Sequence, residues 1–138
     1  MLLPATTLTF TLLPVSHPQK LKRVVMATVI NLAEPKKRIR IKFRVDSGAT
    51  YSVVPKACLK QLGIRPCGTK SLALADGTSI IRKIGNALFS LEDAEGASPV
   101  IVGEKGDTPL LGMVSLEALG YILDPLRREL RPLPMVLG

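Results

Sequence analysis

The most regular pattern in the chain is the alternation of basic and apolar side chains over residues 38–45. A period of two over eight residues predicts a β-strand with one buried and one solvated face. The preceding run at 24–32 is apolar and rich in β-branched residues, which also predicts a strand. Pro35 lies in the polar stretch between them, so we expect the two strands to form a hairpin.

Shorter apolar segments continue this pattern to the end of the chain. Two short helices are predicted, one starting at Pro55 and ending at Gly63, the other following Gly112 and ending at Gly120. Asp76-Gly77 predicts a hairpin turn, since both residues tolerate positive φ. The further strands are expected within residues 51–55, 70–93, 98–103, 121–124 and 127–133. The fold class expected is mainly β with two short helices.

The composition fits one domain. The chain has 138 residues, of which 46% are hydrophobic and only 4% aromatic, so its core must consist mainly of aliphatic side chains. We assign residues 26–138 to this domain and residues 1–25 to an N-terminal arm, flexible or the product of a mis-assigned start. The arm is apolar, but three prolines interrupt it and no basic segment precedes it, which argues against a signal peptide or membrane span. We expect a cytoplasmic protein.

The formal net charge is +8, and the basic excess is concentrated in residues 20–44. Such a cluster is either a solvated face or a contact surface for nucleic acid or an acidic protein. The scarcity of aromatic side chains argues against stacking on single-stranded nucleic acid.

The sequence lacks the residues that most catalytic mechanisms need. The only histidine, His17, lies in the arm, which disfavours Ser-His and Cys-His pairs and metal sites. Cys58 and Cys67 have no cluster of further ligands, and we interpret them as two thiols. No glycine-rich nucleotide-binding motif is present. We therefore expect no metal and no cofactor, which leaves carboxylates as the candidate groups.

Asp46 differs from the other aspartates, which lie in turn-like stretches. It follows the most regular strand and precedes the apolar segment 51–55, so its turn is expected to be semi-buried. A buried carboxylate is costly unless it accepts hydrogen bonds. Ser47, Thr50 and the amides around Gly48 are the expected donors. Taken alone, Asp-Ser-Gly is a weak signal and is more typical of an ordinary turn.

The order and spacing of four motifs resemble the retropepsin-like (clan AA) aspartic proteases, in particular small prokaryotic stand-alone members related to retroviral proteases. These motifs are Asp46-Ser47-Gly48-Ala49-Thr50, Leu74–Thr78, Leu110-Leu111-Gly112, and the helix end with the following segment at 116–125. The resemblance covers residues 26–133. It implies a closed β-barrel of the acid-protease type with one catalytic loop per chain.

The resemblance also implies a mechanism. In this family two aspartates about 3 Å apart share one proton and activate a water that attacks the peptide carbonyl. This chain has a single Asp-Ser/Thr-Gly triplet, so the implied enzyme is a homodimeric aspartic endopeptidase acting on a peptide or protein substrate. Nucleic-acid and membrane partners are not expected for it.

Individual residue roles follow from the same resemblance. Asp46, Ser47 and Gly48 match the catalytic loop, with one Asp46 in each subunit. A flap over the substrate is implied for Ala75, Asp76, Gly77 and Thr78. Support beneath the catalytic loop is implied for Ala49, Thr50, Leu110, Leu111 and Gly112. The alternative is a non-catalytic retropepsin-like or β-barrel binding module that uses the basic strand 38–44 for nucleic acid or an acidic protein.

Overall fold

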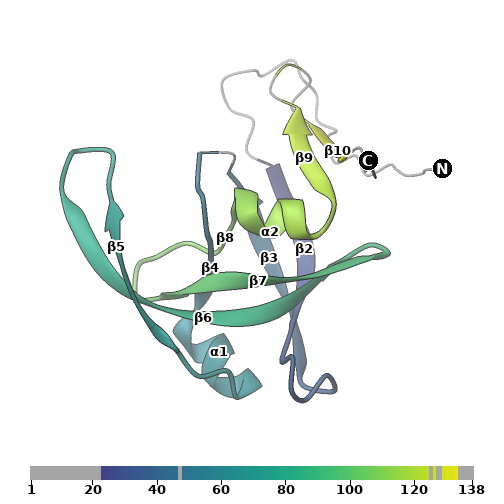
Figure 1. The fold of residues 1–138 in the computed structure, drawn as a ribbon, viewed down its shortest axis with the longest axis horizontal. Coiled ribbons are helices and arrows are strands. Elements are labelled where there is room, and N and C mark those ends of the chain that lie inside the picture. Colours follow the sequence, from purple (N-terminus) through teal and green to yellow (C-terminus); the bar gives the residue numbers. More distant parts are fainter. Residues whose placement is uncertain (1–22, 47, 125, 127–128, 134–138) are drawn as a thin grey trace, which may run out of the picture.

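The computed structural model describes residues 23–46, 48–124, 126 and 129–133. The fold is mainly β, as predicted (Figure 1). Its strands are β2 (Arg23–Ile30), β3 (Arg38–Val45), β4 (Ser52–Pro55), β5 (Gly68–Ala73), β6 (Ser79–Leu91), β7 (Ala94–Gly103), β8 (Leu110–Leu111), β9 (Tyr121–Asp124) and β10 (Glu129–Pro132). The two helices are α1 (Lys56–Leu62) and α2 (Met113–Ala118). Within the described part, no helix is long and apolar enough to cross a membrane.

Six strands form a ring. They follow the order β2-β3-β8-β4-β7-β6, and a further pairing of β2 with β6 joins the two ends. The inward side chains fill the ring with aliphatic residues and the Phe43–Phe89 pair, whose ring centroids lie 5.9 Å apart. Alternation along each strand directs every second side chain into this core. The ring therefore presents its polar faces outward.

The β2–β3 hairpin agrees with the sequence pattern. The two strands pair antiparallel from Ile30 opposite Arg38 to Arg23 opposite Val45. Because β2 already begins at Arg23, residues 23–25 belong to the sheet, although the sequence analysis placed them at the end of the N-terminal arm. Residues 1–22 of that arm lie outside the described residues.

Both predicted helices are present, and each ends just before the glycine that was predicted to stop it. Gly63 follows α1 with φ 74°, and Gly120 follows α2 with φ 86°. α1 begins one residue later than expected, at Lys56, because Pro55 still has the extended conformation of β4. The proline therefore precedes the helix and does not form its first turn.

Two strand boundaries differ from the predictions. β7 begins at Ala94, four residues before the expected start, because residues 94–97 pair with the end of β6. The β5–β6 turn spans Leu74–Thr78, and only Gly77 within it has positive φ, at 91°. The two-residue turn expected at Asp76-Gly77 is therefore wrong in length. Asp76 instead accepts hydrogen bonds from the amide and hydroxyl of Thr78.

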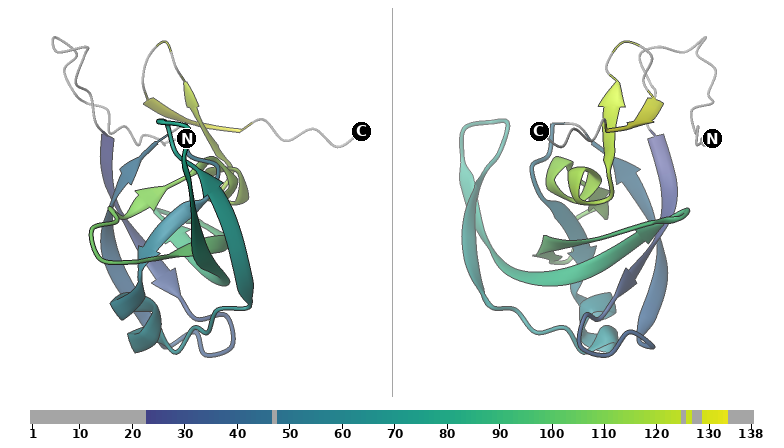
Figure 2. Two further views of the ribbon diagram at one scale, coloured as in Figure 1. Left: turned by 90° about the vertical axis from the view of Figure 1, so that its left-hand side faces the viewer. Right: turned by 45° about the vertical axis from the view of Figure 1, so that its right-hand side comes forward.

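The elements divide between the two ends of the ring (Figures 1 and 2). The β3–β4 connection, α2 and the separate β9–β10 hairpin lie at one end. α1 and the β2–β3 turn lie at the other. β6 extends beyond the ring and pairs there with β5 alone, so the β5–β6 hairpin stands beside the ring with its tip at the same end as the β3–β4 connection.

Candidate active site

Asp46 is the first residue after β3 and is half-buried. Its main-chain N–H donates to the carbonyl oxygen of Leu111 over 3.2 Å, and the N–H of Arg44 donates to Pro109 over the same distance. These bonds continue the parallel pairing of β3 with β8. Since β8 also pairs with β4, the short strand holds both ends of the β3–β4 connection.

The carboxylate of Asp46 has one hydrogen-bond donor among the described residues. The Gly48 amide donates to Oδ1 over 2.8 Å, and the Ala49 amide donates to the Asp46 carbonyl over 3.1 Å. Of the expected donors, Thr50 forms no hydrogen bond with Asp46, and Ser47 lies outside the described residues. The turn thus fixes the orientation of the carboxylate through its own backbone.

The first turn of α2 holds the other side of this loop, which comprises residues 46–50 and is called the Asp46 loop below. The amide of Met113 donates to the Ala49 carbonyl over 2.8 Å, and that of Val114 donates to the Thr50 carbonyl over 3.0 Å. Amides in the first turn of a helix have no partner within the helix. The loop carbonyls satisfy them, so loop and helix stabilise each other.

Gly112 lies directly beneath the Asp46 loop. A Cβ atom added there would be 2.6 Å from the carbonyl carbon and oxygen of Tyr51 and 2.9 Å from the carbonyl oxygen of Ala49. Its φ of −96° is open to any residue, so the constraint is space. This close approach explains why glycine follows the two leucines. Leu111 is fully buried in the core, whereas Leu110 is partly exposed.

A buried chain of three serine hydroxyls links this loop to the ring, and the sequence analysis missed it. Ser52 accepts from the Gly112 amide over 2.9 Å and lies 2.5 Å from Ser115, which lies 2.7 Å from Ser98. Ser98 donates to the Pro99 carbonyl, and each hydroxyl has one proton. The donors must therefore run from Ser52 through Ser115 to Ser98.

One feature of the sequence does indicate this chain of serine hydroxyls. In β4 the alternation places Ser52 on the same inward face as Val54, and both are buried. A hydroxyl at a core position needs a buried partner. The identity of that partner is not readable from the sequence, because Ser115 is 63 residues away.

The residues expected in a flap form the tip of the β5–β6 hairpin. Ala75, Asp76, Gly77 and Thr78 are all exposed, and the turn closes through the Leu74 amide and Thr78 carbonyl over 2.8 Å. The Thr78 hydroxyl and amide, which donate to Asp76, hold the pKa of that carboxyl below its ordinary value. In the described residues no hydrogen bond joins this turn to the Asp46 loop.

Two side-chain contacts near the base of the hairpin connect it to the segments that precede β8 and β4, and neither contact was predicted. Arg82 of β6 donates to both carboxylate oxygens of Asp107 over 2.8 and 3.2 Å. The Arg82 guanidinium lowers the pKa of Asp107, and the carboxylate raises the pKa of Arg82 in return. The ammonium group of Lys70 in β5 lies 5.3 Å from the centre of the Tyr51 ring. Tyr51 is the residue that directly follows the Asp46 loop.

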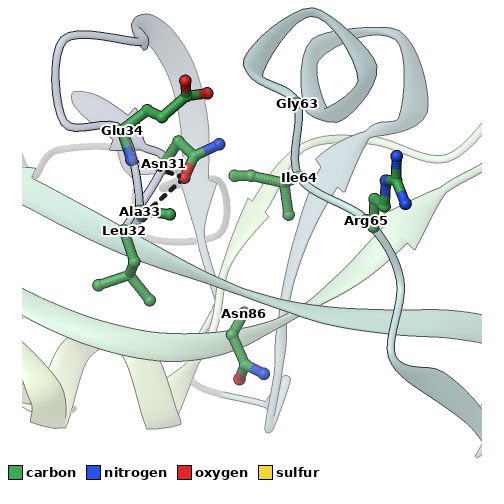
Figure 3. Close-up of a pocket in the computed structure, with 8 residues that line it drawn as sticks. All are labelled: Asn31, Leu32, Ala33, Glu34, Gly63, Ile64, Arg65 and Asn86. Carbon is green, nitrogen blue, oxygen red and sulfur yellow. Dashed lines mark hydrogen bonds between the residues drawn. The ribbon is translucent and has the colours of Figure 1, made fainter.

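An open pocket of about 330 Å³ lies at the opposite end of the ring (Figure 3). Its lining comes from residues 31–34 and 63–65 together with Asn86, and no residue of the Asp46 loop contributes. The side chain of Asn31 accepts hydrogen bonds from the amides of Ala33 and Glu34 there (Figure 3). Its amide group donates to the Leu62 carbonyl over 2.8 Å, so Asn31 serves to join the β2–β3 turn to α1.

Neither cysteine forms a disulfide, with Cys58 partly buried and Cys67 exposed. Within the described part of the chain, no three His, Cys, Asp or Glu side chains gather in a way that could hold a metal ion. What the Asp46 loop itself offers is a carboxylate that the Gly48 amide orients.

Comparison with known proteins gives a family. Residues 36–118 match the family described as gag-polyprotein putative aspartyl protease. A search of curated proteins gave no match. Among solved structures, the chain is similar to the simian foamy virus (mac) protease, with a TM-score of 0.48 and 21% identity over 69% of this chain and 92% of that one. It is also similar to a retropepsin-like aspartic protease from Rickettsia conorii, with a TM-score of 0.44 and 23% identity over 79% and 88%. Because the family match spans more than half of the chain, the predicted resemblance is confirmed, and the chain belongs to the gag-polyprotein putative aspartyl protease family.

Proposed function

We propose that this protein is an aspartic endopeptidase that hydrolyses peptide bonds as a homodimer. The observation that supports this most directly is the Asp46 carboxylate, which the Gly48 amide orients over 2.8 Å at the end of the half-buried strand β3. The backbone around it is held by β8 on one side and by α2 on the other. A carboxylate with fixed orientation is suited to general acid–base catalysis.

The homodimer is inferred from the number of candidate catalytic aspartates in one chain. Activation of water between two carboxyl groups needs two Asp-Ser/Thr-Gly loops, and the chain contains one. A two-fold axis beside the Asp46 loop would bring it together with the partner subunit's Asp46.

The proposed reaction uses one proton shared by the two carboxyl groups. The ionised Asp46 takes a proton from a water molecule whose oxygen bonds to the peptide carbonyl carbon. The protonated partner donates its proton to the carbonyl oxygen, which gives a neutral tetrahedral diol. Asp46 then donates its proton to the peptide nitrogen, and the ionised partner takes a proton from one hydroxyl of the diol as the carbon–nitrogen bond breaks. The amine and the new carboxylic acid leave, and the dyad again holds one shared proton.

The β5–β6 hairpin is proposed to close over the substrate as a flap. Its tip, Leu74–Thr78, reaches the end of the ring at which the Asp46 loop lies (Figure 2). Closure would exclude water that does not take part in the reaction. The polar groups of Asp76 and Thr78 are bonded to each other, and the Gly77 amide donates to the Leu74 carbonyl over 3.0 Å, so the tip is braced by its own hydrogen bonds.

The Asp46→Asn variant tests the proposal. We expect peptide cleavage to fall by roughly 10²- to 10⁴-fold, since the amide can neither accept nor return the proton. Asparagine keeps the Oδ1 acceptor for the Gly48 amide, so the folded structure should remain. Cleavage of a peptide library between pH 3 and 8 measures the first effect, and thermal unfolding checks the second.

Asp93→Asn provides the matched control. Asp93 lies exposed in the β6–β7 turn and is expected to have no role in cleavage. Equal cleavage by wild type and Asp46→Asn would remove Asp46 from the mechanism. A wild-type protein that cleaves no member of the library and sediments only as a monomer would contradict the proposed function as a whole.

A second candidate, a non-catalytic binding module, is supported by the outer face of β3. Arg38, Arg40 and Lys42 are exposed there, and among the described residues none of them forms an ion pair. Nucleic-acid binding that weakens steeply with salt and persists in Asp46→Asn would favour this candidate.

A further inference from the structure

We propose that Lys70 makes the substrate cleft selective for peptides with an acidic side chain near the scissile bond. This inference rests on the proposed function, because it assigns a substrate class to the same site. The two faces of the β5–β6 hairpin differ in charge and in exposure.

Lys70 lies on the face of the hairpin that turns toward the ring. Residues directly opposite one another in antiparallel strands share a face, and Lys70 pairs with Arg82. Alternation adds the pair Leu72 and Ile80 to this face. Arg82, Leu72 and Ile80 are all partly buried, whereas Lys83 and Thr69, a pair on the other face, are exposed.

The Lys70 ammonium lies near the Asp46 loop. It lies 5.3 Å from the ring centre of Tyr51, which directly follows Thr50. The Tyr51 backbone is in turn packed against Gly112 beneath that loop. A substrate lying between the hairpin and the Asp46 loop would therefore pass close to this cation.

The two cations on this face differ in how far their charge is compensated. Arg82 forms a two-point ion pair with Asp107, which also accepts the Glu104 amide. Among the residues that the structure describes, Lys70 has no such carboxylate and contacts only the face of an aromatic ring. A ring face attracts an exposed ammonium only weakly, so a substrate carboxylate can bind Lys70 without displacing a stronger partner.

Paired peptides test this inference. Starting from a peptide that the wild type cleaves, each of the four positions on either side of the scissile bond is made Gln in one peptide and Glu in its pair. We expect kcat/KM to be about fivefold higher for the Glu peptide at one position or more, as an exposed ion pair allows. The difference should shrink at high salt.

Three variants assign the preference to Lys70. Lys70→Met should remove the difference between Glu and Gln peptides, and Lys70→Glu should reverse it. Lys83→Met removes an exposed charge from the opposite face of the same hairpin and should leave the preference intact. Cleavage of the Gln peptides, which lack the acidic group, should stay within about twofold of wild type in Lys83→Met.

The outcomes separate this inference from the proposed function. A wild type that cleaves peptides but shows no Glu preference at any position overturns the role of Lys70 alone. So does a preference that persists in Lys70→Met. A wild type that cleaves no peptide at all overturns the proposed function, and the inference with it.

Discussion

At the scale of single residues, the lack of a side chain at Gly112 explains how closely the backbone of Ala49 and Tyr51 approaches this residue. The loop passes so close to this residue that a Cβ atom would lie 2.6 Å from the Tyr51 backbone. Backbone atoms cannot rotate away as a flexible side chain can. The absence of one methyl group at position 112 thus brings the loop, β8 and α2 into direct backbone contact.

Gly112→Ala should therefore destabilise the protein by about 1–3 kcal/mol, the usual cost of overpacking, and displace the Asp46 loop. We expect cleavage to fall more than stability alone predicts, because Asp46 is held by that loop. Urea unfolding and peptide cleavage measure the two effects. Gly68→Ala is the control, since a Cβ there makes only an ordinary contact at 3.8 Å. Equal stability of both variants would contradict the steric explanation.

Residue by residue, the sequence could identify Asp46 but not most of what surrounds it. A carboxylate directly after a strictly alternating strand is visible without a structure. The serine chain and the Lys70–Tyr51 contact are not, because they join residues that are 17 to 63 positions apart. Such contacts depend on strand register, which the hydrophobic pattern determines for each strand but not between distant strands.

At the scale of elements, the β6–β7 hairpin shows how pairing overrides local composition. Residues 92–96 are acidic or small and predict a loop, yet Ala94 and Glu95 pair with the end of β6. The turn is thereby reduced to Glu92 and Asp93. Two-residue hairpin turns require positive φ at their first position, and Glu92 accordingly has φ 55°. Non-glycine residues adopt this conformation at a cost.

Glu92→Gly should consequently raise the free energy of unfolding by about 0.5–1 kcal/mol, because glycine adopts positive φ without that cost. Asp93→Gly is the matched control, since Asp93 does not have positive φ and glycine there only adds freedom to the unfolded chain. Urea unfolding of both variants measures the difference. A less stable Glu92→Gly protein would show that the side chain of Glu92 matters more than its backbone.

The whole molecule has the mainly β fold and the family that the sequence motifs predicted. The resemblance implied a closed barrel, but the motifs could not tell that β2 and β6 are the strands that close the ring, because these two strands lie far apart in the sheet order. The homodimer stays a prediction. It concerns the whole molecule, because the proposed pair of aspartates needs two chains.

Mixing wild type with Asp46→Asn tests that assembly. If subunits exchange freely and each site needs both aspartates, an equal mixture should contain about one quarter fully wild-type dimers. The activity per wild-type subunit should then fall to about half. A site complete within one chain would leave that activity unchanged. Cleavage assays after overnight mixing distinguish the two results, and sedimentation confirms that the total amount of dimer is constant.

The extent of β6 has a mechanical consequence. Its second half, from Ile84 onward, is bonded to β7, and residues 88–90 also pair with β2. Its first part pairs with β5 alone. The β5–β6 hairpin is therefore held in the ring only at its base, through β6, and its tip at Leu74–Thr78 projects from the ring. Bending at the point where β6 leaves β7 is expected to move the tip, and the contacts of Lys70 with Tyr51 and of Arg82 with Asp107 couple that bending to the segments that precede β4 and β8.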